Sequence, residues 1–144
     1  MVEQLMDKQV IANKIESLRH CLARVEQRCP PDLEQLLNDL DAQDVLTLNL
    51  SRAVQICVDI SLHILSASNQ PMPQTMAEAF AGLVDEEIIS ADIAEKMQKA
   101  IGFRNIAMHE YEKMNWAIVY AIATERLSDF KEFAQCISPL LDGR

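Results

Sequence analysis

The chain has 144 residues, of which 49% are hydrophobic and 24% charged, a composition typical of one globular domain spanning residues 1–144. Its net charge of −9 argues against strong nonspecific nucleic-acid binding, which depends on basic patches, but allows a small local site for an anion. No apolar run reaches the roughly 20 residues that cross a bilayer. The N-terminal residues also lack an apolar signal core. We therefore expect a cytoplasmic protein that does not act at a membrane.

The expected helices begin with one that runs from the candidate N-cap Asp7 to about Cys29. Apolar residues recur along it at spacings of four and three, which predicts one buried stripe. That stripe is Ile11, Ile15, Leu18, Leu22 and Val25. Pro30 and Pro31 end the helix. Residues 32–40 are expected to form a short helical turn or a loop.

A second long helix is expected from Asp41, as its cap, to about Ser66. Its main apolar stripe is Leu46, Leu50, Ala53, Cys57, Ile60 and Ile64, and further apolar residues widen it. A helix that is apolar on two sides either lies at the centre of the bundle or also faces a second protomer. The segment 69–73, with two prolines, is a clear break.

The second half of the chain predicts three more helices. Thr75 and Glu78 form a candidate capping box for a shorter one, and Ser90 begins a fourth that carries Arg104. Asn115 can cap a last helix. Its apolar face would use Trp116, Val119, Ala123, Leu127, Phe130 and Ile137, and Pro139 and Gly143 would mark its frayed end. No alternation typical of strands is present, so the predicted fold is an all-α bundle of four or five helices.

Cysteine and histidine spacing predicts no metal centre. The four cysteines form no CxxC pair, the three histidines lie far apart, and no zinc-type cluster or glycine-rich phosphate loop is present. We expect reduced thiols, with Cys57 acting as a small core residue, and no cofactor.

The most informative segment is Arg104-Asn105-Ile106-Ala107-Met108-His109-Glu110-Tyr111. Arginine keeps its charge and binds phosphate oxygens in pairs. Histidine changes charge near neutral pH and can exchange a proton during a reaction. Together Arg104 and His109 could hold and cut a phosphodiester without a metal.

The spacing of this segment, with four residues between Arg and His and one between His and Tyr, resembles that of the HepT-type RNase toxins of the HEPN family. The resemblance implies a HEPN-type bundle that forms a symmetric homodimer. It also implies a metal-independent endoribonuclease toxin of a toxin–antitoxin pair, with Arg104 and His109 catalytic and RNA as substrate. The implied antitoxin is a nucleotidyltransferase that attaches AMP to the motif tyrosine, Tyr111.

Two further residues are candidates for supporting roles. Asn105 could orient the phosphate or the motif backbone. HEPN proteins often have an acidic residue on the second helix near the motif, and Asp59 is the candidate here, as a group that orients Arg104 or His109. Asp59 and His63, four apart, can instead form a polar patch or a satisfied pair with no role in the site.

Helix geometry limits how the motif can work. At about 100° per residue, Arg104 and Tyr111 share a face of a continuous helix, whereas His109 points elsewhere. Either the helix ends near Met108 and the backbone redirects His109, or a second copy of the chain completes the site.

Two readings without RNA cleavage also stand. In the first, Arg104 bridges to a carboxylate and His109 stabilises the helix C-terminus as a cation, so the cluster is structural. In the second, the chain is a non-catalytic helical subunit that binds a nucleotidyltransferase, which suits the charge of −9.

Overall fold

The structure is a computed structural model, and it describes residues 6–142. The elements in chain order are α2 (Lys8–Arg28), α3 (Leu33–Leu37), α4 (Leu40–Ser66), α5 (Met76–Asp85), α6 (Ala91–His109), the 3-10 turn η1 (Tyr111–Lys113), α7 (Trp116–Glu125) and α8 (Leu127–Leu141). No strand occurs in residues 6–142, so the predicted all-α fold is confirmed.

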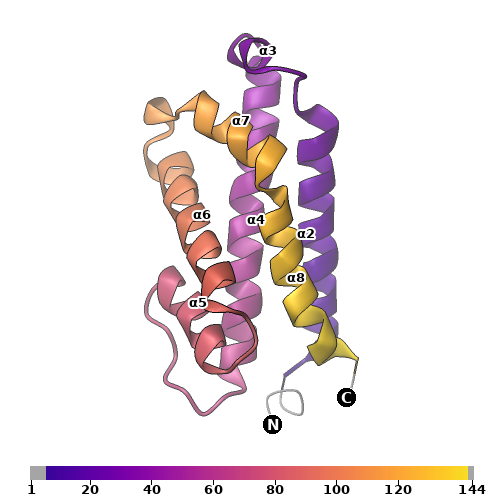
Figure 1. Ribbon diagram of the computed structural model, residues 1–144, viewed down its shortest axis with the longest axis vertical. Coiled ribbons are helices and arrows are strands. Elements are labelled where there is room, and N and C mark those ends of the chain that lie inside the picture. Colours follow the sequence, from indigo (N-terminus) through magenta and orange to yellow (C-terminus); the bar gives the residue numbers. More distant parts are fainter. Residues whose placement is uncertain (1–5, 143–144) are drawn as a thin grey trace.

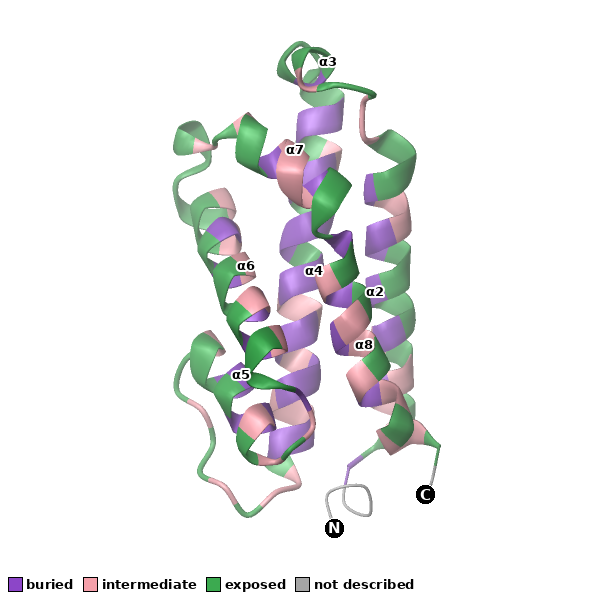
Figure 2. Cartoon of the chain, in the orientation of Figure 1, coloured by how far each residue is buried: buried purple, intermediate pink, exposed green. Residues whose placement is uncertain are grey.

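Helix α4 is the centre of the bundle. In Figure 1 it runs between α2 on one side and α6 on the other, with α7 and α8 crossing in front. Within residues 6–142 it contacts each of the other six α-helices. Buried residues follow its whole length in Figure 2. The predicted stripe is fully buried: Leu46, Leu50, Ala53, Cys57, Ile60 and Ile64.

The burial of α4 also accounts for its apolar composition. By length and mean hydropathy (1.3 over its most apolar 18 residues) α4 could cross a bilayer, but 61% of that window is buried inside the bundle. Fully burying one Leu or Ile side chain contributes about 1.5–3 kcal/mol. The surplus apolar surface that could have indicated a second protomer is therefore covered mostly by the chain itself.

The first two long helices begin at aspartates, one of them earlier than expected. Asp7 caps α2, because its Oδ1 accepts hydrogen bonds from the backbone N–H groups of Gln9 and Val10. The expected cap of α4 at Asp41 is wrong. Asp39 Oδ1 accepts from the N–H of Ala42 at 3.0 Å, and Asp41 lies in the first turn, where its charge favours the helix dipole.

The helix α5 closes one end of the bundle. Thr75 Oγ1 accepts from the N–H of Glu78, and the Glu78 carboxylate accepts from the N–H of Gln74, so the capping signal is confirmed with its return bond one residue earlier. Gly82 is buried against α4, and a Cβ placed there would lie 2.7 Å from Leu65 Cδ1. The missing side chain lets the two helices approach.

The expected single last helix is in fact two. Arg126, with φ −118° and ψ 4°, leaves helical geometry between α7 and α8. The bend lets α7 contact α3 while α8 packs against α2 and α6, which one straight helix could not do. Pro139 does not mark the frayed end, because α8 continues to Leu141, and Gly143 lies outside the described residues.

Candidate active site at the end of α6

The motif lies on the last two turns of α6. Ser90 Oγ accepts from the N–H of Ile93 and begins the helix, and four buried side chains then fix it against the bundle. They are Ala94, Met97, Ile101 and Phe103. The helix ends only after His109, where Glu110 adopts φ −142° and ψ 45°. The N–H of Glu110 still donates to the Ile106 carbonyl at 2.8 Å.

Arg104 and His109 do not point the same way. Five residues along a helix turn the direction by about 140° from the starting azimuth. Arg104 lies half-buried toward the bundle, whereas His109 is exposed. The option that the backbone redirects His109 is wrong, because His109 is the last residue inside the helix. Within one chain the two side chains therefore leave α6 in different directions.

Tyr111 is the residue that the helix end redirects. It begins the 3-10 turn η1, so it does not continue the α6 face that carries Arg104, and the expectation of a shared azimuth is wrong. Its hydroxyl donates to Asp44 Oδ1 of α4 at 2.8 Å. Its ring, which is 40% exposed, packs edge-on against Trp116 with centroids 5.9 Å apart. The motif tyrosine is therefore held on α4.

The surroundings of the Tyr111 phenol favour its neutral form. Partial burial raises its pKa above the ordinary value of 10.0, and the hydrogen bond and negative charge of Asp44 raise it further. At neutral pH the hydroxyl keeps its proton and donates it to the carboxylate. This bond ties η1 to α4.

The acidic residue of α4 that meets the motif is Asp44, not Asp59. Asp59 lies fifteen residues further along, about 22 Å at 1.5 Å per residue. Its carboxylate accepts from Gln55 Nε2 at 2.9 Å and lies 3.8 Å from Lys14 Nζ of α2. The prediction that Asp59 orients Arg104 or His109 is wrong within the chain. Sequence could have found Asp44 only by knowing that the C-terminal end of α6 lies beside the first turns of α4.

Arg104 and His109 are free to bind a ligand. Among residues 6–142, neither has a carboxylate within 4.0 Å, so the reading in which Arg104 bridges to an acid is wrong. Arg104 makes one long contact, from Nη1 to Asn105 Oδ1 at 3.4 Å, which brings Asn105 beside the guanidinium. His109 lies in the last turn of α6, where an imidazolium favours the helix dipole.

The second histidine candidate is structural. His63 Nε2 accepts a hydrogen bond from the backbone N–H of Asp7 at 3.1 Å and so ties the start of α2 to the end of α4. Asp59 bonds elsewhere, so the two residues act separately. In the described part of the chain, no three His, Cys, Asp or Glu side chains group closely enough to hold a metal ion.

Known proteins share both the sequence and this fold. Residues 18–137 match the family described as "Ribonuclease HepT-like". The mRNA nuclease HepT of Shewanella oneidensis is 33% identical over 128 residues, which are 89% of this chain and 96% of that protein. The tRNA nuclease HepT of Aphanizomenon flos-aquae is 24% identical over 132 residues, covering 92% and 90%.

Solved structures agree. A tri-AMPylated Shewanella oneidensis HEPN toxin in complex with an MNT antitoxin superposes with a TM-score of 0.84 at 32% identity, covering 90% of this chain and 97% of that one. A toxin–antitoxin complex with AMP-PNP gives 0.85 at 31% identity, covering 91% and 98%. The resemblance drawn from the Arg104–Tyr111 segment is thus confirmed, and the chain belongs to the HepT-like ribonuclease family.

Proposed function

We propose that this protein is a metal-independent endoribonuclease toxin whose catalytic groups are Arg104 and His109. The observation that carries the proposal is that, among residues 6–142, neither side chain has an ion pair, although both lie at the end of a well-fixed helix. A structural cation is normally paired or hydrogen-bonded when it is partly buried. Arg104 is half-buried and makes only the long contact to Asn105.

The reaction follows from the two groups. The ribose 2′-oxygen attacks the adjacent phosphorus, and the bond from phosphorus to the 5′-oxygen breaks, leaving a 2′,3′-cyclic phosphate and a 5′-hydroxyl. His109 takes the proton of the attacking hydroxyl or gives one to the leaving oxygen. Arg104 donates two hydrogen bonds to the phosphate oxygens as their charge grows, and Asn105 steadies the guanidinium.

A symmetric homodimer would bring these groups together. Because His109 points about 140° away from Arg104, the site needs His109 from one protomer and Arg104 from its partner. An exposed apolar surface adjoins the motif: Leu40 and Leu48 flank Asp44 on one face of α4, and Met108 lies one turn after Arg104. Their exposed fractions are 74%, 51% and 57%. Covering that surface with a second copy would complete the site.

A nucleotidyltransferase antitoxin is the proposed regulator. It would transfer AMP to Tyr111: the phenol oxygen attacks the α-phosphorus of ATP, pyrophosphate leaves, and a tyrosyl phosphodiester forms. The Asp44 carboxylate, which already accepts the hydrogen bond of the hydroxyl, would take its proton. The added nucleotide lies two residues from His109, where its bulk and negative charge would exclude RNA. Free cysteines among the described residues suit the reducing cytoplasm, where we place the protein.

RNA cleavage by the purified chain in excess EDTA tests the proposal. General acid–base catalysis is worth roughly 10²–10⁴ in rate, so His109→Ala should lose about that factor while keeping its helical circular dichroism. His20→Ala, an exposed histidine on α2, is the matched control and should cleave like the parent. The non-catalytic alternative is a nucleotidyltransferase-binding subunit, which the charge of −9 favours. It predicts that neither the parent nor the His109→Ala or His20→Ala variant cleaves RNA.

A further inference from the structure

A pocket of about 450 Å³ lies along α6 beside the motif. It opens between α6 on one side and α7 and α8 on the other, with α4 at its base. Its volume lies in the range of about 300–1,000 Å³ typical of small-molecule sites. Neither Arg104, His109 nor Tyr111 lines it, so the catalytic groups alone do not account for it.

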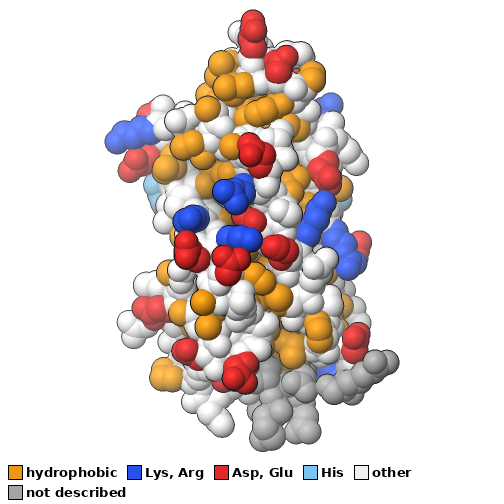
Figure 3. Space-filling view, in the orientation of Figure 1, with side chains coloured by type: hydrophobic (Ala, Val, Ile, Leu, Met, Phe, Trp, Pro, Cys, Tyr) orange, Lys and Arg blue, Asp and Glu red, His pale blue; other side chains and the backbone are white. Residues whose placement is uncertain are grey.

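The floor of the pocket is apolar and its mouth is charged. Apolar side chains form the walls: Leu50, Val54, Phe103, Ile106, Ile118 and Phe130. Ile106 and Ile118, on α6 and α7, are 40% and 53% exposed and face the opening. Four of the 13 basic residues of the chain also line it, together with three acids. Figure 3 shows basic and acidic side chains side by side near the middle of the face it draws.

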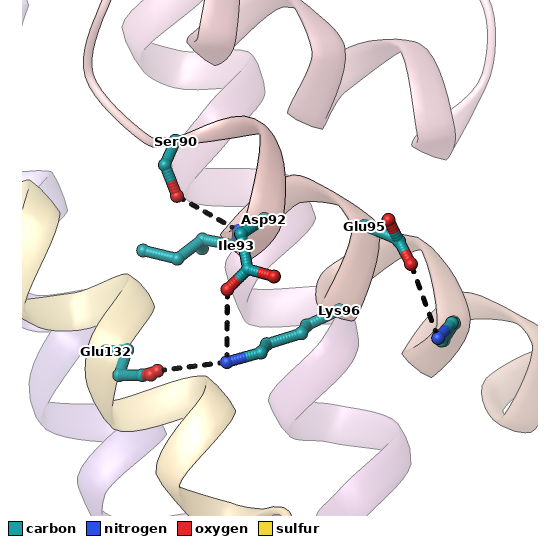
Figure 4. A network of polar contacts seen from close by, with 7 residues as sticks. Ser90, Asp92, Ile93, Glu95, Lys96 and Glu132 are labelled. Atoms are coloured by element: carbon teal, nitrogen blue, oxygen red, sulfur yellow. Dashed lines mark hydrogen bonds and ion pairs between the residues drawn. The ribbon is translucent and has the colours of Figure 1, made fainter.

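Ion pairs engage the lysines that line the pocket, whereas Arg126 has no such partner among residues 6–142. At the end nearest the start of α6, Lys96 Nζ lies 3.3 Å from Asp92 and 3.4 Å from Glu132 of α8, as Figure 4 shows. Lys99 pairs with Glu95. Lys113, just past the end of α6, lies 3.6 Å from Glu110. Arg126, at the junction of α7 and α8, has no carboxylate within 4.0 Å among residues 6–142. Its guanidinium can bind a ligand.

Gly102 shows that this space is kept open. Glycine inside a helix costs about 0.5–1 kcal/mol relative to alanine. At Gly82 the missing side chain is needed for packing, but a Cβ at Gly102 would meet nothing within 4 Å. Gly102 lines the pocket, so no contact within the described chain explains the glycine. Room for a ligand explains it.

The pocket also leads toward the catalytic histidine. Gly102, Ile106 and His109 follow one another at spacings of four and three, so they share one side of α6. Ile106 lies about 4.5 Å along the axis before His109. A molecule seated in the pocket can therefore continue into the catalytic site.

We infer that this pocket holds one unpaired base of the RNA strand next to the phosphate that is cut. A base has a flat apolar body for the walls that include Phe103, Ile106 and Ile118, and polar edges for the charged groups of the mouth. Arg126 stacks on the base or holds its phosphate, as arginine does in single-stranded RNA recognition. The inference rests on the proposed RNase function, and it supplies the substrate recognition that a chain of charge −9 otherwise lacks.

The polar groups of the mouth favour certain bases. Asp129 presents a carboxylate to the pocket and accepts hydrogen bonds. Adenine, cytosine and guanine offer this carboxylate an exocyclic amino group with two N–H donors, whereas uracil offers only its single ring N3–H. The site should therefore select against uracil. The rival occupant is a protein side chain from a partner. A concave pocket with an unpaired arginine suits a base better than it suits the flat face of a partner helix.

Binding by an inactive variant tests the pocket without relying on cleavage. The probe is a fluorescein-labelled single-stranded RNA, either intact or with one abasic position, titrated into full-length His109→Ala protein. A register series moves the abasic position along the strand. At one register, loss of the base should weaken binding about tenfold, and uracil there should weaken it more than adenine. Equal affinity for every abasic register would overturn the inference.

Variants then locate the binding effect. Adding Ile118→Trp or Arg126→Gln to His109→Ala should remove the difference between intact and abasic RNA. The matched controls are Ala81→Trp, at an exposed position of α5, and Arg28→Gln, at the exposed end of α2, and both should keep that difference. If the pocket variants keep it too, the base lies elsewhere. If they only weaken binding of a nucleotidyltransferase, the occupant is a protein.

Cleavage by the parent separates this inference from the proposed function. If the parent does not cut RNA but binds intact RNA better than abasic RNA, the proposed RNase function is wrong and the base pocket is supported. If the parent cuts RNA and Ile118→Trp leaves the cleavage sites and the KM unchanged, the RNase function is supported and the base pocket is wrong.

Discussion

The two halves of α6 treat charge in opposite ways. In the first half, Lys96 bridges Asp92 and Glu132, and Lys99 pairs with Glu95. In the second half, Arg104 and His109 have no carboxylate partner in the described part of the chain. The first half fixes the helix on the bundle, and the second presents groups to a ligand. An arginine and a histidine without such partners at the end of a fixed helix suit an anionic substrate.

Mixing two inactive variants is the strongest test of how the unpaired groups on the second half of α6 combine into a site. If each site takes Arg104 from one protomer and His109 from the other, Arg104→Ala and His109→Ala mixed by refolding should form heterodimers with one intact site. Equal mixing should restore about one quarter of the parent sites. RNA cleavage in EDTA measures the recovery, and light scattering should report about twice the 16.3 kDa chain mass. No recovery from a verified dimer would place both groups of each site in one chain.

Removing the Tyr111 hydroxyl tests whether AMP transfer to this residue controls the groups on the second half of α6. Tyr111→Phe should accept no AMP from the cognate nucleotidyltransferase and should stay toxic when the two are co-expressed. Mass spectrometry of the peptide containing Tyr111 measures the modification. Tyr120→Phe is the matched control, because its hydroxyl instead donates to the Pro30 carbonyl at 3.1 Å. AMP on the Tyr111→Phe peptide would show that another residue is the acceptor.

The sequence predicted the helices well because their signals are local. Caps at Asp7, Thr75, Ser90 and Asn115 depend on residues two or three positions away. The bend at Arg126 could not be predicted, because the apolar face continues across it and only packing on α2, α3 and α6 divides the helix. Such divisions come from tertiary contacts that periodicity does not record.

The motif spacing predicted the family, and the comparisons confirm it. The roles of Arg104, His109 and Tyr111 stay predictions, and their arrangement in space could not be predicted. The supporting acid was assigned to Asp59 because the family resemblance implies an acidic residue on the second helix, whereas Asp44 makes the contact across 67 residues of sequence. A single chain gives no signal for such a contact. The pocket beside Gly102 likewise depends on four helices that only the fold brings together.

The free energies of unfolding of two glycine-to-alanine variants compare the packed and open sides of the bundle. Gly82→Ala would place a Cβ 2.7 Å from Leu65 and should destabilise the fold by about 1–3 kcal/mol, the usual cost of overpacking. Gly102→Ala meets open space and should stabilise it by about 0.5–1 kcal/mol through helix propensity. Urea unfolding followed by circular dichroism measures both. A loss of stability at Gly102 would mean that the pocket is closed in solution.

The bond from Tyr111 to Asp44 is the fixed point of the second half of α6, and its effect should be visible at alkaline pH. Since the folded pKa of Tyr111 is raised above 10.0, its contribution to stability is complete below pH 10 and is lost as pH rises through the folded pKa. Asp44→Asn removes the negative charge, so the Tyr111 pKa should fall back toward 10.0, and burial alone should keep part of the shift.

Phenolate absorbance near 295 nm measures this titration in a Tyr120→Phe background, which leaves Tyr111 as the one tyrosine of the chain. Asp59→Asn removes the same charge about 22 Å further along α4 and is the matched control, so its Tyr111 curve should overlay that of the parent. Asp44→Ala, which removes the acceptor as well as the charge, should cost about 1 kcal/mol of stability, the usual net value of one hydrogen bond. Coincident titration curves for Asp44→Asn and Asp59→Asn would mean that η1 is not held on α4 in solution, and the motif tyrosine would then be as free as His109.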